Sequence, residues 1–222
     1  MGGAVELALA GERLHLLAER AVLLPEHSTL LVADAHVGKA GLFRRLGVPV
    51  PQGTTAAMLL MLTRLIDATR AEHLVFLGDF LHSSAAHAES TQKALAEWRR
   101  RHATLALTLV RGNHDMHAGD PAPSLRIAAH DEPLHLGGLA LCHHPRSVAG
   151  YYALAGHLHP CVSAAARARD RLRLPCFWFA QSPSRQVGVL PAFGAFTGMQ
   201  EIARQPGDRV FAVATDRVLE LP

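Results

Sequence analysis

Cysteine is scarce in this sequence, and its spacing excludes two kinds of site. The chain contains three cysteines, Cys142, Cys161 and Cys176, and no C-x-x-C pair. An odd count without close pairs argues against a disulfide framework and against a zinc cluster held by thiolates. Because unpaired cysteines suit a reducing compartment, we expect a cytoplasmic protein.

Long apolar segments are absent as well. No uninterrupted apolar stretch reaches about 18 residues, the length that predicts a membrane-spanning helix. The first residues carry Glu6 and Glu12 and lack an apolar run, which is not the pattern of a secretory signal. We therefore expect no association with a membrane.

Two common hydrolase motifs are also missing. Gly38 and Lys39 look like part of a phosphate-binding P-loop, but Ala40 stands where that motif requires serine or threonine. Ser182 and Ser184 lie outside any G-x-S-x-G context, so a serine hydrolase is not supported. The chemistry has to be sought in other residue types.

Histidine, in contrast, is abundant. The 15 histidines outnumber the eight Phe, two Tyr and two Trp residues combined. An apolar fraction of 49% and a charged fraction of 18% are those of a globular protein, and we expect one domain spanning residues 1–222. The net charge of +3 permits an anionic partner without requiring one. The histidine excess suggests metal binding.

Short apolar runs bounded by Gly, Pro, Asp or His predict strands, and their lack of polar alternation is typical of strands buried on both faces. Two longer segments, Thr54–Arg70 and Ala88–Arg101, repeat apolar residues at three- and four-residue steps and predict helices. The order of elements indicates an α/β fold with two packed sheets flanked by helices. The predicted strands are Leu30–Ala33, His73–Leu77, Leu105–Val110, Leu139–Cys142, Tyr152–Ala155 and Val210–Ala214, and Glu6–Leu24 allows a further pair.

Strong metal ligands follow five of these strands at their ends. Asp34 and His36 stand two residues apart, so on an extended chain they face the same way. Loops at strand ends are where rigid scaffolds commonly place functional residues. Carboxylate, amide and imidazole ligands suit Mn, Fe, Zn or Mg, and their number exceeds what one tetrahedral ion needs, so we expect two ions. The groups are Asp34–His36, Gly78–Asp79, Gly112–Asp115, His143–His144 and Gly156–His159.

These five groups, in this order, resemble the motifs of the calcineurin-like metallophosphoesterases. That resemblance implies a four-layer sandwich of two mixed sheets with helices. Other segments are similar to the ligase-associated DNA damage response endonucleases of bacteria, which are described as manganese-dependent phosphodiesterases and single-strand DNA endonucleases. This narrower resemblance implies a role in DNA repair and a functional association with a DNA ligase, a helicase and an exonuclease. Its segments are Leu31–Ala40, Phe43–Arg45, Val48–Pro51, Gly78–Ser83 and Leu190–Gly198.

The resemblance also implies a ligand set for two divalent ions. Manganese is the expected metal, and iron or zinc fits the same ligands. Two such ions lower the pKa of a bound water, so that a metal-activated hydroxide attacks phosphorus in line. One ion would be held by Asp34, His36 and His159, the other by Asn113, His143 and His157, and Asp79 would bridge both.

Further catalytic roles follow from the same resemblance. His114 would stabilise charge on the phosphate or protonate the leaving alkoxide, and Asp115 would orient His114 or a neighbouring ligand. His82 would touch the substrate or donate to the phosphate. His144 stands where many relatives have glycine. Because alternate strand residues face opposite sides, His143 is favoured over His144 as the ligand.

Basic and aromatic residues beside the motifs have two interpretations. Lys39, Arg44 and Arg45 contact the phosphate backbone of a nucleic acid, or they form the solvated face of a helix. Phe193 and Phe196 stack on bases, or they pack in the core, which is favoured.

We therefore expect a two-metal phosphodiesterase and, from the narrower resemblance, an endonuclease that cleaves single-stranded DNA. Two alternatives stay open. A phosphoesterase for a cyclic nucleotide or a nucleotide would use the same chemistry in a capped, narrow site. A non-catalytic scaffold of the same fold would typically have lost the catalytic histidine or several ligands, and all of these are present here.

Overall fold

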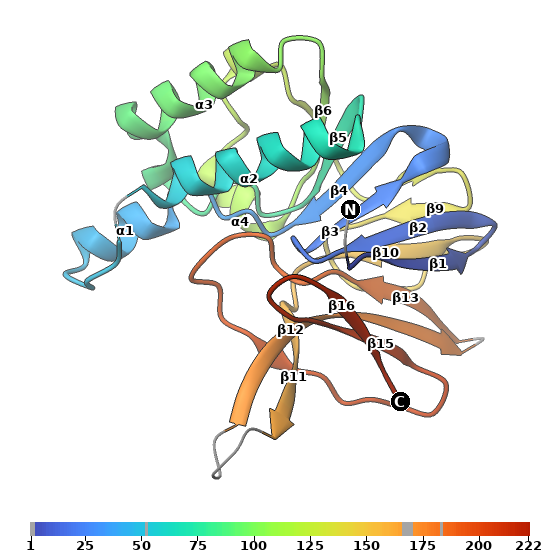
Figure 1. Ribbon diagram of the computed structural model, residues 1–222. Coiled ribbons are helices and arrows are strands. Elements are labelled where there is room, and N and C mark those ends of the chain that lie inside the picture. The colour runs from blue at the N-terminus through green and yellow to red at the C-terminus, as the bar shows by residue number, and fades with distance from the viewer. Residues whose placement is uncertain (1–2, 52, 166–170, 183) are drawn as a thin grey trace.

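Two mixed β-sheets packed face to face form the body of the protein (Figure 1). The computed structural model describes residues 3–51, 53–165, 171–182 and 184–222. None of the helices in these residues is long and apolar enough to span a membrane. The expected fold class, two packed sheets with flanking helices, is confirmed.

The first sheet has seven strands, ordered as they occur along the chain. They are β1 (Val5–Leu9), β2 (Glu12–Leu17), β3 (Ala21–Leu24), β4 (Thr29–Ala33), β5 (His73–Leu77), β6 (Ala106–Val110) and β7 (Ala128–His130). Neighbours are antiparallel from β1 to β4 and parallel from β4 to β7. Ala33 lies opposite Leu77, and Leu77 opposite Val110. The carboxyl ends of β4, β5 and β6 therefore meet at one edge.

Helices α2 (Thr54–Thr69) and α3 (Glu89–Arg101) lie over the outer face of this sheet (Figure 1). The other helices are α1 (Lys39–Arg45), α4 (Asn113–Ala118) and the 3₁₀ helices η1 (Pro25–His27), η2 (Ser84–His87) and η3 (Pro123–Leu125). Met58, Leu62 and Ile66 of α2 recur every four residues, and they pack with Leu95 and Trp98 of α3 in one buried cluster.

Strand β4 shows why the central runs are apolar at every residue. Leu30 and Val32 belong to the core beneath the helices, whereas Leu31 and Ala33 belong to the core between the two sheets. Successive side chains of a strand point to opposite faces, and here both faces are covered. The sequence of β4 therefore shows no alternation of polar and apolar residues because both faces of the strand are buried.

The second sheet has nine strands and carries the remaining part of the site. They are β8 (Leu134–Leu136), β9 (Leu139–Leu141), β10 (Tyr152–Ala155), β11 (Pro160–Ala165), β12 (Arg171–Ser182), β13 (Arg185–Val189), β14 (Gln200–Glu201), β15 (Arg209–Val213) and β16 (Val218–Leu221). Seven follow the order β14-β11-β12-β13-β10-β9-β8, and β15 pairs with β12 and β16. Strand β10 is parallel to both β9 and β13.

The outer face of this second sheet packs against loops in the described part of the chain. Val148 and Tyr151, from the connection between β9 and β10, contact the small cluster that contains Ala140, Ala153 and Val187. That connection is shorter than the dozen or more residues that a helical crossover between parallel strands usually needs. The outermost of the four expected layers is formed here by loops rather than by a helix.

The predicted element bounds agree with the structure in most places. The helices predicted over Thr54–Arg70 and Ala88–Arg101 match α2 and α3 to within one residue. The N-terminal prediction is corrected, because Glu6–Leu24 contributes to three strands and not to a pair. The third of these strands, β3, is buried at all four residues, so its sequence shows no alternation that would separate it from β2.

Candidate metal centre

Loops from both sheets meet at one edge of the sandwich. The N–H of Asp34, after β4, donates to the carbonyl of Gly78, after β5, at 3.2 Å. The N–H of His157, after β10, donates to both carboxylate oxygens of Asp34 at 3.0 and 3.1 Å. The N–H of Gly156 donates to the carbonyl of His143, after β9, at 3.1 Å. These bonds tie the loops of the two sheets together.

Five of the predicted ligands adopt the left-handed backbone conformation, which L-residues rarely use. Such residues cost about 1 kcal/mol or more each and concentrate at functional sites. The extended backbone expected from Asp34 to His36 is therefore wrong, and left-handed turns bring the two side chains together instead. The φ angles are 54° at Asp34, 47° at His36, 49° at Asp79, 70° at His157 and 49° at His159.

Glycines precede three of the ligands, Asp79, Asn113 and His157, because no side chain fits there. A Cβ on Gly78 would overlap the imidazole ring of His143. A Cβ on Gly112 would overlap the carboxylate of Asp79 and lie 3.0 Å from Cε1 of the same ring. The glycines of these motifs thus admit ligands that come from other strands.

The first group of ligand atoms comes from Asp34, His36 and His159. The Nε2 atoms of the two histidines are 3.4 Å apart, and Nε2 of His159 lies 3.5 Å from Oδ1 of Asp34. The carboxylate of Asp34 is fully buried, and only 2% of the His36 side chain is exposed. These three residues can hold one metal ion.

The second group comes from Asn113, His143 and His157. Nε2 of His143 lies 3.0 Å from Oδ1 of Asn113 and 3.1 Å from Nδ1 of His157. Asp79 faces both groups, because its Oδ1 is 3.5 Å from Nε2 of His143 and its Oδ2 is 3.8 Å from Nε2 of His36. The structure therefore brings all seven predicted ligands to one place, with the Asp79 carboxylate between two sets.

Burial controls the charge of this cluster. It lowers the pKa of His36 to about 2 and the pKa of His143 to about 4, so both rings are neutral near pH 7. Burial also raises the pKa of Asp79 above its ordinary value. The neutral rings of His36 and His143 bring no positive charge to the buried carboxylates, whereas the Asp34 carboxylate outweighs burial and raises the pKa of His159. A divalent cation supplies positive charge to such a cluster.

The imidazole rings are oriented as metal-binding histidines usually are. Nδ1 of His143 donates to the carbonyl of Leu77 at 3.2 Å, and Nδ1 of His159 donates to the carbonyl of Gly198 at 2.9 Å. A carbonyl only accepts, so each Nε2 keeps a lone pair that faces the cluster. The facing atoms are 3.0 to 3.5 Å apart, near the roughly 3 Å that ligand bonds of about 2.1 Å produce. The residues present fit divalent ions.

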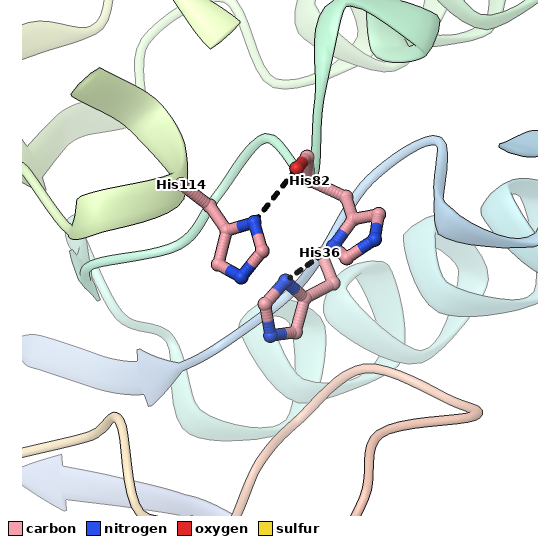
Figure 2. Close-up of side chains that lie close together, drawn as sticks. All are labelled: His36, His82 and His114. Atoms are coloured by element: carbon pink, nitrogen blue, oxygen red, sulfur yellow. Dashed lines mark hydrogen bonds between the residues drawn. The ribbon is translucent and has the colours of Figure 1, made fainter. Parts of the chain in front are cut away.

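His114 and His82 lie at the rim of the first group (Figure 2). Nδ1 of His114 donates to the main-chain carbonyl of His82 at 2.8 Å, and their rings stack with centroids 4.7 Å apart. Nδ1 of His82 lies 3.2 Å from Nδ1 of His36. Burial, with a smaller contribution from the Lys39 charge, lowers the pKa of His82 to about 4. Both rings stay partly exposed beside the buried ligands.

Asp115 supports the main chain and does not contact the ring of His114. Its buried carboxylate accepts hydrogen bonds from the N–H groups of Phe80 at 3.3 Å, Leu81 at 2.8 Å and Gly112 at 3.0 Å. These donors flank Asp79 and Asn113 along the chain. The orienting role predicted for Asp115 is therefore directed at the ligand loops, and the His82 carbonyl orients His114.

His143 and His144 differ in their surroundings. His143 is fully buried within the cluster, whereas the His144 side chain is 45% exposed and its Nδ1 lies 3.1 Å from Oε1 of Glu132. The other Glu132 oxygen accepts the N–H groups of both histidines, at 2.6 and 2.9 Å. No motif in the sequence pointed to Glu132, which follows β7 and is eleven residues from His143. His144 remains within reach of His143 and His157.

The three predicted basic residues do not share one environment. Lys39 is half-buried and lines a cavity with His36. Arg44 is exposed and donates to the carbonyl of Pro51 at 2.9 Å, and Arg45 is exposed on the same helix. Neither arginine lines that cavity. The interpretation as phosphate contacts suits Lys39, and the solvated helix face suits the two arginines.

Comparisons with known proteins add independent information. A family model described as calcineurin-like phosphoesterase matches residues 27–166. The crystal structure of Pseudomonas putida nuclease MPE is similar with a TM-score of 0.86 and 41% identity, covering 98% of this chain and 100% of that one. The E. coli phosphoesterase YfcE gives a TM-score of 0.45 at 13% identity, covering 87% of this chain and 97% of that one. A search of curated proteins finds no match.

Proposed function

The chain belongs to the calcineurin-like phosphoesterases, a family of metal-dependent phosphoester hydrolases, and from this premise we propose that it is an endonuclease acting on single-stranded DNA in repair. The observation that carries the proposal is the pair of ligand groups that share Asp79 beside His114. The 41% identity with a nuclease over 98% of the chain supports a nucleic-acid substrate.

Both the number and the identity of the metal ions are part of this proposal. Two divalent ions, manganese first, would supply Lewis-acid activation of water and neutralise charge on the phosphate. Asp34, His36 and His159 would hold one ion, and Asp79 would face both. Asn113, His143 and His157 would hold the other, with His143 rather than His144 because only the His143 ring is fully buried among the other ligands.

His114 is placed to transfer a proton. Its Nδ1 donates to the His82 carbonyl, so Nε2 is the nitrogen that gains and loses a proton. Nε2 lies 3.9 Å from Oδ2 of Asp79, at the rim of the ligand groups, and 37% of the His114 side chain is exposed. When protonated, His114 donates its Nε2–H to the leaving oxygen, which is general acid catalysis.

His82 and Lys39 complete the side of the site where the phosphate binds. The His82 ring stacks on His114 and is partly exposed, so a substrate phosphate can reach both rings from solvent. Lys39 brings an ammonium group to the cavity beside His36. Fixed positive charge and hydrogen-bond donors at this rim stabilise the charge that develops on the phosphate.

Exposure at the site favours a polymer over a small enclosed substrate. The side chain of His114 is 37% exposed, and His157 is exposed as well. A phosphodiester in the middle of a flexible strand reaches such ligands without entering a closed pocket. We further propose that the enzyme acts in the cytoplasm together with a DNA ligase, a helicase and an exonuclease, as the narrower family resemblance implies.

Hydrolysis assays with Mn²⁺ test the proposal on three substrates: bis-p-nitrophenyl phosphate, p-nitrophenyl phosphate and a single-stranded DNA circle. We expect turnover of the diester and cleavage of the circle, lost in Asp79→Asn and kept in Arg70→Ala. Arg70 is a matched control, because this exposed arginine ends α2 at the opposite edge of the sheet. Turnover of the monoester alone would identify a small-substrate phosphoesterase, and no turnover of any substrate would support a scaffold.

A further inference from the structure

The segment between β13 and β14 is fixed against the first ligand group at both ends. The N–H groups of Phe193 and Gly194 donate to the carbonyls of Ala33 and Asp34 at 2.8 and 3.0 Å. Farther along, the carbonyl of Gly198 accepts Nδ1 of His159. The residues between these anchors therefore form a wall directly beside the proposed ligands.

Phe196 lies in the middle of this wall and faces solvent. Its side chain is 43% exposed, in contrast to Phe193, which is 1% exposed and packs in the core. The backbone of Phe196 is left-handed, with a φ of 60°. The residue lines two cavities, one of which contains His36 and Lys39 and the other His159. An exposed aromatic ring thus stands between two approaches to the candidate metal centre.

Arg20 lines the second cavity, which has a volume of about 210 Å³. It belongs to the turn between β2 and β3, with a φ of 63° and its N–H bonded to the carbonyl of Leu17 at 3.0 Å. Strand β3 is antiparallel to β4, with Val22 opposite Leu31. The turn before β3 therefore lies at the edge where β4 ends and Asp34 follows.

The guanidinium of Arg20 has no carboxylate partner among the residues that the structure describes. Burial lowers its pKa below the ordinary value, and the side chain is partly buried, so the cation loses part of its hydration without receiving an anion in return. A partly buried arginine of this kind beside a phosphoester-hydrolysing site suits a phosphate, which guanidinium groups bind in a bidentate manner. Four other arginines have acidic partners, Arg13 with Glu26, Arg111 with Asp120, Arg185 with Asp208 and Arg209 with Glu220. Arg44 and Arg45 have none among the described residues, but unlike Arg20 they are exposed.

We propose that Arg20 and Phe196 form a subsite for the nucleotide next to the cleaved phosphate, with the base stacked on Phe196 and its phosphate bound by Arg20. This inference rests on the proposed nuclease function and assigns the nucleotide contacts of the same site. Stacking on an aromatic ring requires an unpaired base, and it tolerates any base sequence because every base has a π-face. The subsite therefore selects single strands over duplex without selecting sequence.

Equilibrium binding measured by fluorescence anisotropy separates the two roles. The full-length protein is used with its metal bound, in a His114→Ala background that slows cleavage. Two labelled probes are compared, an oligothymidylate of about 12 nucleotides and an abasic oligomer of the same length, within the range of site sizes known for single-strand binding folds. The probes carry the same phosphates and differ only in their bases.

We expect Phe196→Ala to weaken binding of the oligothymidylate about tenfold, while binding of the abasic oligomer changes less than about twofold. Arg20→Ala is expected to weaken binding of both probes. It is also expected to reduce the slope of log affinity against log salt concentration by about 0.7, the value for one phosphate contact on a single strand. Phe196→Trp is expected to keep the binding of the oligothymidylate, Arg20→Lys to keep the salt slope but only part of the affinity, and the Arg70→Ala control to bind like the parent.

Two results would overturn the subsite, and they differ from failure of the nuclease function. If Phe196→Ala weakens binding of both probes equally, the stacking role is wrong although the protein still binds DNA. If Arg20→Ala leaves the slope of log affinity against log salt concentration unchanged, the phosphate-binding role is wrong. If the parent protein binds neither probe, the proposed nuclease function itself fails. Circular dichroism spectra and thermal unfolding of each variant establish that a loss of binding is not a loss of fold.

Discussion

Nδ1 of His114 donates a hydrogen bond to the main-chain carbonyl of His82 at 2.8 Å. This one contact occupies Nδ1 and leaves Nε2 as the free ring nitrogen of His114, the one to which the proposed function assigns the proton transfer. Because the acceptor belongs to the backbone, this hydrogen bond does not depend on the side chain at position 82. The two histidines can therefore be separated by mutation.

Replacing His114 with alanine is expected to lower kcat about 10²- to 10⁴-fold, the range for loss of a general acid, with little change in KM. His82→Ala is expected to cost less, because the carbonyl that orients His114 remains. Steady-state kinetics on bis-p-nitrophenyl phosphate check both values, and elemental analysis checks that each variant keeps its metal. Equal losses of kcat in the two variants would contradict separate roles.

Mutation of His143 and of His144 tests which of these neighbouring histidines is the metal ligand. We expect His143→Ala to lose metal and activity, since its Nε2 lies within 3.5 Å of Asn113, His157 and Asp79 atoms. His144→Ala is expected to keep both, because its Nδ1 faces Glu132. Metal content per chain after gel filtration measures the difference. Loss of one ion in His144→Ala would transfer the ligand role to that residue.

Removal of metal is expected to destabilise the native protein, because the ions bind the folded state and not the separated loops. At free Mn²⁺ about 100-fold above its Kd, linkage predicts a gain of about 2.7 kcal/mol in the free energy of unfolding. Urea unfolding with Mn²⁺ and with a chelator measures this gain. Asp79→Asn is expected to abolish the gain, and a gain of wild-type size in that variant would argue against Asp79 as a ligand.

Asp115→Asn tests the support of the ligand loops. The amide can accept fewer of the three N–H bonds that the buried carboxylate receives. We expect a loss of about 2–3 kcal/mol in the free energy of unfolding, from buried donors left unsatisfied. Chemical denaturation measures the loss against Asp131→Asn, a control at a carboxylate that is 90% exposed. Identical midpoints for the two variants would contradict this role.

Asp208 predicts a pH dependence of stability far from the site. Burial opposes its ionisation, but hydrogen bonds from the Gln205 N–H, Trp178 and Arg185 outweigh burial and lower the pKa of its carboxyl. A lowered folded-state pKa stabilises the protein above the unfolded value of about 3.9, and this stabilisation is lost as pH falls through the folded value.

Asp208→Asn should therefore be less stable than wild type at pH 7, by about 1–3 kcal/mol, and the difference should shrink below about pH 4. Thermal or urea unfolding across this pH range measures it. The matched control is Asp216→Asn, where the carboxylate is 70% exposed and pairs with the adjacent Arg217, and where little change is expected. A difference that persists undiminished at low pH would exclude ionisation as the cause.

Sequence reasoning located the strand-end groups because each buried strand is visible in a short local window. The run before Asp34 and the run before Asp79 are apolar at every residue, and a polar ligand interrupts each of them abruptly. Helix α2 was equally visible, since it repeats its apolar face over several turns. Helix α3 was visible from the apolar pair Leu95 and Trp98 and from the three arginines that end it. Such local patterns can be recognised without knowing which residues distant in the sequence contact one another.

The remaining features depend on residues that are distant in the sequence. Helices α1 and α4 span seven and six residues, too short for a periodic signal. Left-handed conformations at the ligands, and the carbonyls that orient His114 and His159, are invisible in a list of residue types. Arg20 lines a cavity with His159 because β3 pairs with β4, and no motif marks it. The pairing of strands therefore brings together the part of the site that the spacing of residues along the sequence does not reveal.

The close packing of ligand side chains against Gly78 and Gly112 limits how this site can evolve. Each glycine makes room for a side chain from a different loop, the ring of His143 in one case and the Asp79 carboxylate in the other. A substitution at either position would displace a ligand encoded elsewhere in the chain, so these loops cannot diversify one at a time. Exposed side chains without this interlocking, such as Phe196 and the arginines Arg44 and Arg45 of helix α1, are where a descendant of this protein can change while keeping its metal ligands.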